Sequence, residues 1–189
     1  MKRSIIAAAM LLGGISSAQA SDVEMYAGIG AGMVGIEYSQ PGLNINQNVP
    51  AVMLKFGVNF NEFFGVETRL AGTADGDTPV GASKVELGTG FVSILAKVQY
   101  PVSSDFSVYV LGGGTSATLS RKQTTTAGAV LIDDKATEFG GSYGLGMEFK
   151  IKDNMSVSGD WMQYWSSVNV GPGISTTLWG ATATFNYYF

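Results

Sequence analysis

The chain alternates apolar and polar residues over segments that are longer than the strands of ordinary soluble sheets. In the final segment, Thr177 to Phe189, aromatic residues or alanine fill every second position from Trp179, and Thr182, Thr184 and Asn186 lie between them. Successive side chains of a β-strand point to opposite faces, so this strand has one apolar and one polar face. A strand crosses a bilayer in about 9 to 11 residues, whereas a strand of a soluble sheet has about 5 to 6. The pattern therefore predicts strands that cross a membrane.

Eight segments of this kind lie between clusters of turn-forming residues. They cover approximately residues 24–38, 51–60, 63–73, 88–100, 106–120, 138–150, 155–166 and 176–189. Short connections at residues 59–62, 101–105 and 151–154 alternate with longer ones at residues 39–50, 74–87, 121–137 and 167–175. Outer-membrane barrels have short periplasmic turns and longer outer loops. We therefore predict an all-β fold, an eight-stranded antiparallel up-and-down transmembrane β-barrel.

Charged residues within the segments fall on the face opposite to the apolar residues. In residues 63–73, the phase that directs Phe64 and Val66 outward directs Glu67 inward. Six charges are assigned to the interior in this way: Lys55, Glu67, Arg69, Lys97, Glu148 and Asp160. An eight-stranded barrel is only wide enough for side chains to fill it, and an unpaired charge inside would be costly. We expect a charge-paired plug in the lumen and no open channel.

The first 20 residues have the features of a secretory signal. Lys2 and Arg3 precede an apolar run from Ile5 to Ile15, and Ala18-Gln19-Ala20 supplies the small residues that a signal peptidase reads. The apolar run is too short for a transmembrane helix, which needs about 20 residues. We predict a signal peptide at residues 1–20 and a barrel domain at residues 21–189.

Composition argues against most enzymes and against nucleic-acid binding. The chain contains no cysteine and no histidine, which removes thiolate and imidazole metal ligands and the most common general base. Without Lys2 and Arg3 there are 9 basic and 15 acidic residues, a net charge of −6, and no basic block that could bind nucleic acid. We expect no catalytic residues, no cofactor and no metal, and we interpret the interior acids as ion-pair partners rather than catalytic carboxylates.

Three other features have a functional and a structural interpretation. Residues 30–35 match the G-x-G-x-x-G dinucleotide pattern, but they lack the strand and helix that this fingerprint requires, so the glycines are assigned to barrel packing. The aspartates of the outer loops, Asp75, Asp77, Asp133 and Asp134, are interpreted as solvated charge in preference to a cation site. The aromatic residues near segment ends are assigned to the two interfacial girdles, with Trp165 as the one to test for ligand binding.

The mature chain resembles the outer-membrane β-barrel domain family, the small eight-stranded, porin-like barrels of the OmpA and OmpX type. Residues 56–67, 143–157 and 185–189 carry this resemblance, the first two as strand, tight turn and strand. The resemblance implies a monomeric protein of a Gram-negative outer membrane that contacts lipids. It also implies that Phe185, Tyr187 and Phe189 form the C-terminal signal for the barrel assembly machinery. Barrels of this size that modify lipid A rely on histidine, so their activity does not carry over.

The leading hypothesis for function is a non-enzymatic surface barrel whose outer loops meet a host or environmental ligand, in adhesion or in membrane integrity. The alternative is a narrow pore, or a small-ligand-binding or transport barrel that uses the lumen. A soluble lipocalin-like barrel would need an apolar interior and a polar exterior, which is the reverse of the charge placement.

Overall fold

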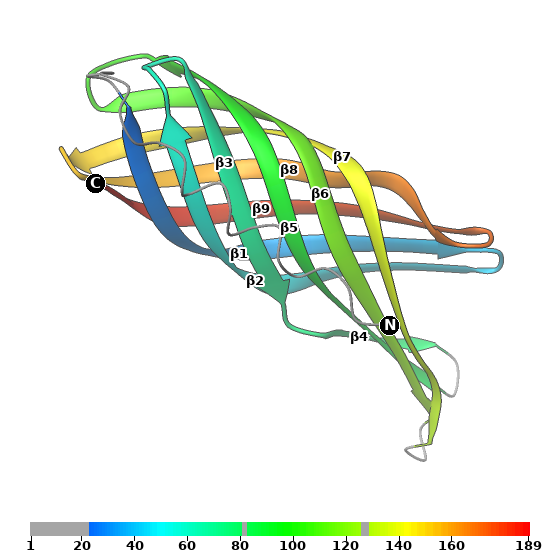
Figure 1. The fold of residues 1–189 in the computed structure, drawn as a ribbon. Coiled ribbons are helices and arrows are strands. Elements are labelled where there is room, and N and C mark those ends of the chain that lie inside the picture. Colours follow the sequence, from blue (N-terminus) through cyan, green and yellow to red (C-terminus); the bar gives the residue numbers. More distant parts are fainter. Residues whose placement is uncertain (1–22, 81–82, 126–128) are drawn as a thin grey trace, which may run out of the picture.

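The fold consists of antiparallel β-strands that pair with their neighbours in chain order (Figure 1). The structure is a computed structural model that describes residues 23–80, 83–125 and 129–189, so the predicted signal peptide lies outside the described residues. Among the described residues, no helix is long and apolar enough to cross a membrane. The strands are β1 (Glu24–Gln40), β2 (Leu43–Asn59), β3 (Phe64–Thr73), β4 (Gly76–Val80), β5 (Ser83–Pro101), β6 (Phe106–Thr125), β7 (Val130–Lys152), β8 (Met155–Gly171) and β9 (Ile174–Tyr188).

Eight of these strands close into a ring. β1 pairs with β9 from Tyr26 opposite Tyr188 to Ser39 opposite Ser175, which joins the first strand to the last. β3 pairs directly with β5, and the short β4 extends along β5 beyond the end of β3. The predicted class, an all-β, eight-stranded antiparallel up-and-down barrel, is confirmed.

One end of the barrel, which we call the turn end, holds the three short connections. The Asn61 side chain accepts hydrogen bonds from the backbone N–H groups of Phe63 and Phe64, at 2.8 Å each, and so closes the turn between β2 and β3. The Ser103 hydroxyl accepts a hydrogen bond from the Phe106 N–H at 3.1 Å in the turn between β5 and β6. Asparagine and serine suit such turns because their side chains bond to the nearby backbone. β1 begins and β9 ends at this same end.

The strands continue much further at the opposite end, the hairpin end, than the sequence predicted. Most of residues 39–50, 121–137 and 167–175, predicted as loops, belong to strands, and residues 74–87 contain β4 and the start of β5. The turn between β1 and β2 is reduced to Pro41 and Gly42, and the turn between β8 and β9 to Pro172 and Gly173. Gly42 and Gly173 have φ angles of 81° and 69°, a conformation that glycine adopts without steric cost. The loop prediction was wrong because the strands carry a different residue pattern here, described below.

The ring divides at the hairpin end into two sheets that diverge in Figure 1. β7 pairs with β8 only as far as Tyr143 opposite Gln163, and β2 pairs with β3 only as far as Ala51 opposite Thr73. We call the sheet of β2, β1, β9 and β8 beyond these points, residues 34–50 and 164–179, the first leaf. The second leaf comprises β4, β5, β6 and β7, in the described parts of residues 76–91 and 116–142.

The side chains around the ring reverse their polarity between the two ends. Toward the turn end, exposed residues such as Ile29, Leu54 and Ile94 form an apolar outer surface, while polar side chains fill the inside. In the leaves, the buried inner face is mainly apolar and includes Val34, Ile36, Ile45, Val49, Val85, Leu87 and Leu119. The prediction of a polar interior therefore describes the turn-end half only.

Candidate functional site: the ionic lumen and the two leaves

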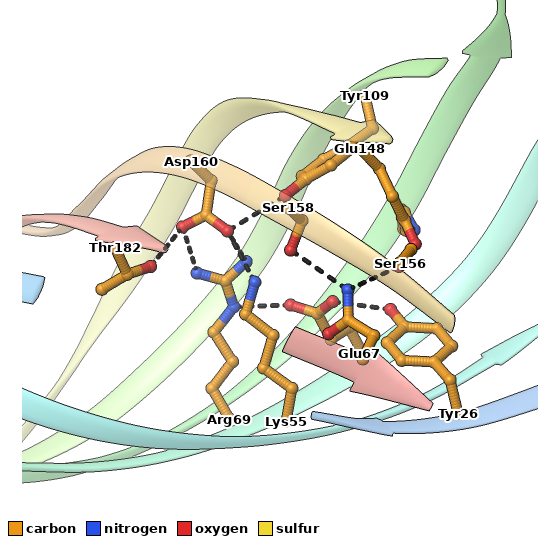
Figure 2. Close-up of polar contacts among 12 residues, drawn as sticks. Tyr26, Lys55, Glu67, Arg69, Tyr109, Glu148, Ser156, Ser158, Asp160 and Thr182 are labelled. Carbon is orange, nitrogen blue, oxygen red and sulfur yellow. Dashed lines mark hydrogen bonds and ion pairs between the residues drawn. The ribbon is translucent and has the colours of Figure 1, made fainter. Parts of the chain in front are cut away.

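Asp160 on β8 is the centre of the luminal charges (Figure 2). Its carboxylate accepts two hydrogen bonds from the Arg69 guanidinium, at 2.8 and 3.0 Å, and one from Lys55 Nζ at 2.6 Å. The hydroxyls of Tyr109 and Thr182 donate to it at 3.0 and 2.9 Å. Asp160 is 8 % exposed, and Arg69 is fully buried. A buried carboxylate needs such a complete set of donors, because an incompletely paired buried charge is strongly destabilising.

Glu67 extends this cluster toward β1. It lies two residues from Arg69 on the same face of β3 and accepts a hydrogen bond from Arg69 Nε at 2.5 Å. The hydroxyl of Tyr26 donates to its other oxygen at 2.6 Å. Arg69 therefore bridges two carboxylates, as its planar guanidinium allows.

Glu148 and Lys97 form a second ion pair nearer the turn end. Lys97 Nζ lies 3.1 Å from Glu148, which also accepts hydrogen bonds from Ser156 at 2.5 Å and from the Tyr188 hydroxyl. Lys97 Nζ also lies 5.1 Å from the ring centre of Tyr26 and 4.8 Å from that of Tyr109, within cation–π range. These two rings join the Glu148 pair to the Asp160 cluster.

The structure brings together all six charged residues that the sequence assigned to the interior. Their exposed fractions range from 0 to 8 %. The sequence analysis missed the tyrosines that complete the network: Tyr26, Tyr109, Tyr164 and Tyr188. The strand phase predicts an inward Tyr188, because its neighbours Tyr187 and Phe189 face outward. Glycines in residues 24–38 and 106–120 blur the phase, and so they concealed Tyr26 and Tyr109.

An apolar core closes the interior between the leaves. Trp165 is fully buried in this core, and its indole N–H donates to the Thr115 carbonyl at 3.1 Å. The expectation that Trp165 lies in a girdle, where it would be open to a ligand, was therefore wrong. β8 changes register on both sides of Trp165, so simple alternation does not predict its direction. Tyr26 and Tyr38 were also assigned to girdles, but both are buried inside.

Two contacts between side chains link the leaves across their inner faces, among the described residues. The Gln47 amide on β2 donates to the Thr78 hydroxyl on β4 at 2.5 Å. Arg121 on β6 donates to the Tyr38 hydroxyl at 2.6 Å and to the Gln40 side chain at 3.3 Å, both on β1. These contacts, which we call the clasps, hold the two sheets together where they no longer share a ladder of backbone hydrogen bonds.

The outer surface of the second leaf is charged. Lys84 Nζ lies 2.7 Å from Asp77 and 3.1 Å from Glu86, and these hydrogen bonds raise the pKa of Lys84. Lys122, Asp133 and Lys135 are also exposed on this leaf. Among the described residues, no group of three or more acidic side chains is placed to hold a metal ion.

A cavity lies at each end of the molecule. The one at the turn end has a volume of about 800 Å³, and its lining includes Glu24, Asn59, Asp105, Glu148 and Tyr188. The one at the hairpin end, about 310 Å³, lies between β7 and the β8–β9 hairpin, and its lining includes Tyr38, Arg121 and Ile174. The ionic network and the apolar core occupy the interior between them.

The C-terminal residues Phe185, Tyr187 and Phe189 lie on the outer face of β9. They are 42, 40 and 79 % exposed, and the rings of Tyr187 and Phe189 meet edge to face with their centres 5.3 Å apart. The Phe189 N–H donates to the Met25 carbonyl at 2.9 Å, which ties the last residue to the start of β1.

Comparison with known proteins agrees with this architecture. Ail of Yersinia pestis, solved with the heparin analogue sucrose octasulfate, is 18 % identical, with a TM-score of 0.56 over 86 % of this chain and 99 % of Ail. Neisserial surface protein A is 13 % identical, with a TM-score of 0.65 over 87 % of this chain and 97 % of that protein. The N-terminal barrel of OprF from Pseudomonas aeruginosa is 10 % identical, with a TM-score of 0.55 over 86 % and 97 %. At these identities the likeness shows the fold.

No curated protein sequence matches the chain. Residues 5–189 match the family described as "Outer membrane protein beta-barrel domain". The apolar outer surface is therefore the part that meets lipid, the turn end is periplasmic, and the leaves project outside the cell. The chain belongs to the outer membrane protein beta-barrel domain family and resides in the cell outer membrane.

Proposed function

We propose that this protein is a non-enzymatic, monomeric surface barrel that acts through its two leaves, in contact with a host or environmental surface. The filled interior carries this proposal. Each of the six luminal charges has an ion-pair partner within 3.1 Å, and above them the core between the leaves is apolar. The outer faces of the leaves are the exposed surface that projects beyond the lipid.

The luminal carboxylates support a structural role. A catalytic acid or base has to reach a substrate, whereas Glu67, Glu148 and Asp160 are buried and bonded to cations and hydroxyls of the barrel itself. Perturbed charge networks in proteins are often structural.

Attachment of cells that display the barrel tests the proposal. Expression in a bacterial host that does not itself adhere should increase attachment to cultured epithelial cells or to extracellular matrix. Alanine at exposed residues of both leaves, Asn44, Asn46, Asn48, Lys84, Lys122 and Lys135, should reduce that attachment to the level of the empty host. A lipid-facing variant, Leu70→Ala, provides the control and should attach as the parent does. Equal attachment with and without the barrel would contradict the proposal.

The alternative is a narrow pore or a small-ligand transport barrel. A pore would need the Lys97–Glu148 pair to open, because its side chains lie between the turn-end cavity and the Asp160 cluster. Planar-bilayer recordings distinguish the two functions. We expect no steady conductance from the parent protein, and a conductance that changes in Lys97→Ala would favour the pore.

We also propose that Phe185, Tyr187 and Phe189 form the recognition signal for the barrel assembly machinery. Their exposure on one face of the last strand supports this role. Deletion of Phe189 should lower the amount of heat-modifiable barrel in the outer membrane in cells, while refolding of the purified variant into detergent stays efficient. Equal loss in both assays would indicate a folding defect and contradict a signal.

A further inference from the structure

The outer face of the first leaf is almost free of charge, in contrast to that of the second. Strand pairing places its residues in rows across four strands. The outermost row consists of Asn44, Ser39, Ser175 and Asn169. The next row contains Asn46, Glu37 and Thr177, and Glu37 is its one charge. The second leaf has six charged residues on its outer face: Asp77, Lys84, Glu86, Lys122, Asp133 and Lys135.

A tryptophan packs over a glycine at the membrane side of these rows. In the third row, Asn48 and Trp179 flank Gly35 on β1. The Trp179 indole lies over Gly35, with Cζ2 2.7 Å from where a Cβ atom of residue 35 would be and two further ring atoms closer still. Glycine is required here because any side chain would displace the ring. The indole therefore packs against the sheet at Gly35, and Trp179 remains partly exposed.

We infer that this face, defined by Asn44, Asn46, Asn48, Ser175, Thr177 and Trp179 and called the amide face, binds neutral glycan chains. Each asparagine amide offers two donors and an acceptor, and each hydroxyl can both donate and accept, which matches the hydroxyl groups of a sugar. Neighbouring strands lie about 4.8 Å apart and alternate residues about 6.6 Å apart, so these groups form a grid. The flat indole supplies an apolar surface for the C–H face of a pyranose ring.

The chemistry of the amide face disfavours other partners. A sulfated or phosphorylated polyanion requires clustered cations, and none of the residues in these three rows is lysine or arginine. Protein interfaces usually have an apolar core, but apart from Trp179 the face carries no large apolar side chain. A strand edge is often protected by charged residues, whereas the outward positions 44, 46 and 48 on the outer part of β2 are asparagine.

The inference rests on the proposed surface role and names its partner class. The purified barrel in phospholipid nanodiscs is mixed with malto-, cello-, chito- and galacto-oligosaccharides of four to six sugars, and with heparin. Saturation-transfer NMR detects weak binding. We expect at least one neutral oligosaccharide to bind, and heparin to leave the amide face unoccupied.

Two matched pairs of variants locate the site. The triple variant N44A/N46A/N48A should weaken binding at least tenfold. S116A/T118A/S120A on β6 has the same spacing on the outer face of the second leaf and should change binding less than twofold. Trp179→Ala should abolish binding and Trp179→Phe should restore part of it, while Trp161→Phe at the membrane surface should have no effect. Heat-modifiable migration confirms that each variant is folded.

Three results would overturn the inference: no neutral oligosaccharide binds, binding survives the triple asparagine variant, or the amide face instead mediates association between copies of the chain. Cells that display the barrel and still attach through the second leaf would leave the proposed surface role standing. If every leaf variant loses attachment and no glycan binds, the neutral glycan is refuted as the partner, and the proposed role in surface attachment is kept.

Discussion

The barrel has a membrane half, toward the turn end, and an outer half, formed by the two leaves. On the same strands, the outward face is apolar in the membrane half and polar in the outer half. On β5, Ile94 faces lipid and Lys97 faces the lumen, whereas Lys84 faces solvent and Leu87 is buried between the leaves. The strand pairing of β5 with β6 has no register shift from Ser83 to Pro101, so the alternation keeps its phase throughout. The solvent outside the barrel changes from lipid to water, and the residue types on each face exchange accordingly.

The comparison explains why the outer half is a double sheet. Inside the membrane the ring must close, because an unpaired backbone group in lipid costs several kcal/mol. Outside the membrane, water satisfies open strand edges, so β7 can part from β8, and β2 from β3. The two leaves then pack against each other through an apolar core, as the sheets of a soluble sandwich do.

The largest effect is expected from breaking the ionic cluster in the membrane half. Asp160→Ala leaves Lys55 and Arg69 without their shared partner, and we expect a loss of about 3–5 kcal/mol in the free energy of unfolding. Urea unfolding in lipid vesicles, followed by tryptophan fluorescence, measures it. Asp134→Ala, at an exposed position of the second leaf, should stay within about 0.5 kcal/mol. Similar losses in both variants would show that the cluster has no special role.

A cavity in the outer half is expected to cost somewhat less. Leu87→Ala removes a fully buried side chain between the leaves and should cost about 3 kcal/mol, because the packed core cannot close the gap. Leu70→Ala removes the same side chain from the lipid-facing surface, where lipid chains can refill the space. The same unfolding experiment should give a clearly smaller loss for Leu70→Ala, and equal losses would argue against a packed core between the leaves.

A charge introduced on the outer face of β5 is expected to have different effects on stability in the membrane half and in the outer half. Ile94→Arg places a cation against lipid and should cost about 2 kcal/mol. Glu86→Arg, on the same face of β5 but in water, breaks only the exposed pair with Lys84 and should cost less, about 1 kcal/mol at most. The yield of folded barrel from vesicles, read from heat-modifiable gel migration, reports the difference. Equal yields of the two variants would indicate that positions 94 and 86 face the same surroundings, which would contradict the difference between the halves.

The smallest effect is expected from loosening one clasp. Thr78→Val removes the acceptor for Gln47 and should cost about 1 kcal/mol. Hydrogen exchange of β4 amides should become faster, whereas exchange within the membrane half stays unchanged. Thr124→Val, at an outward position of β6, is the control. If β4 exchanges at the same rate in the Thr78 variant and in the parent, the contact does not hold the leaves together.

Sequence alone predicted the membrane half well and the outer half poorly. Alternation assigned Lys55, Glu67, Arg69, Lys97, Glu148 and Asp160 to one side, because lipid leaves most outward positions in these segments apolar. Beyond about residues 38, 88, 120 and 138, polar residues face outward, and the inner apolar residues, such as Ile45 and Leu87, are too few to stand out from a loop composition. The bulges of β8 break the period altogether, which is why the position of Trp165 could not be predicted.

Single-cysteine scanning of β5 tests the central claim most directly, because the chain has no cysteine of its own. In vesicles, cysteines at positions 84 and 86 should react with a water-soluble maleimide. Fluorophores on cysteines at positions 92 and 94 should be quenched by spin-labelled lipid, and cysteines at positions 87 and 97 should be protected from both reagents. Maleimide labelling at position 94, or lipid quenching at position 84, would contradict the reversal of polarity between the two halves.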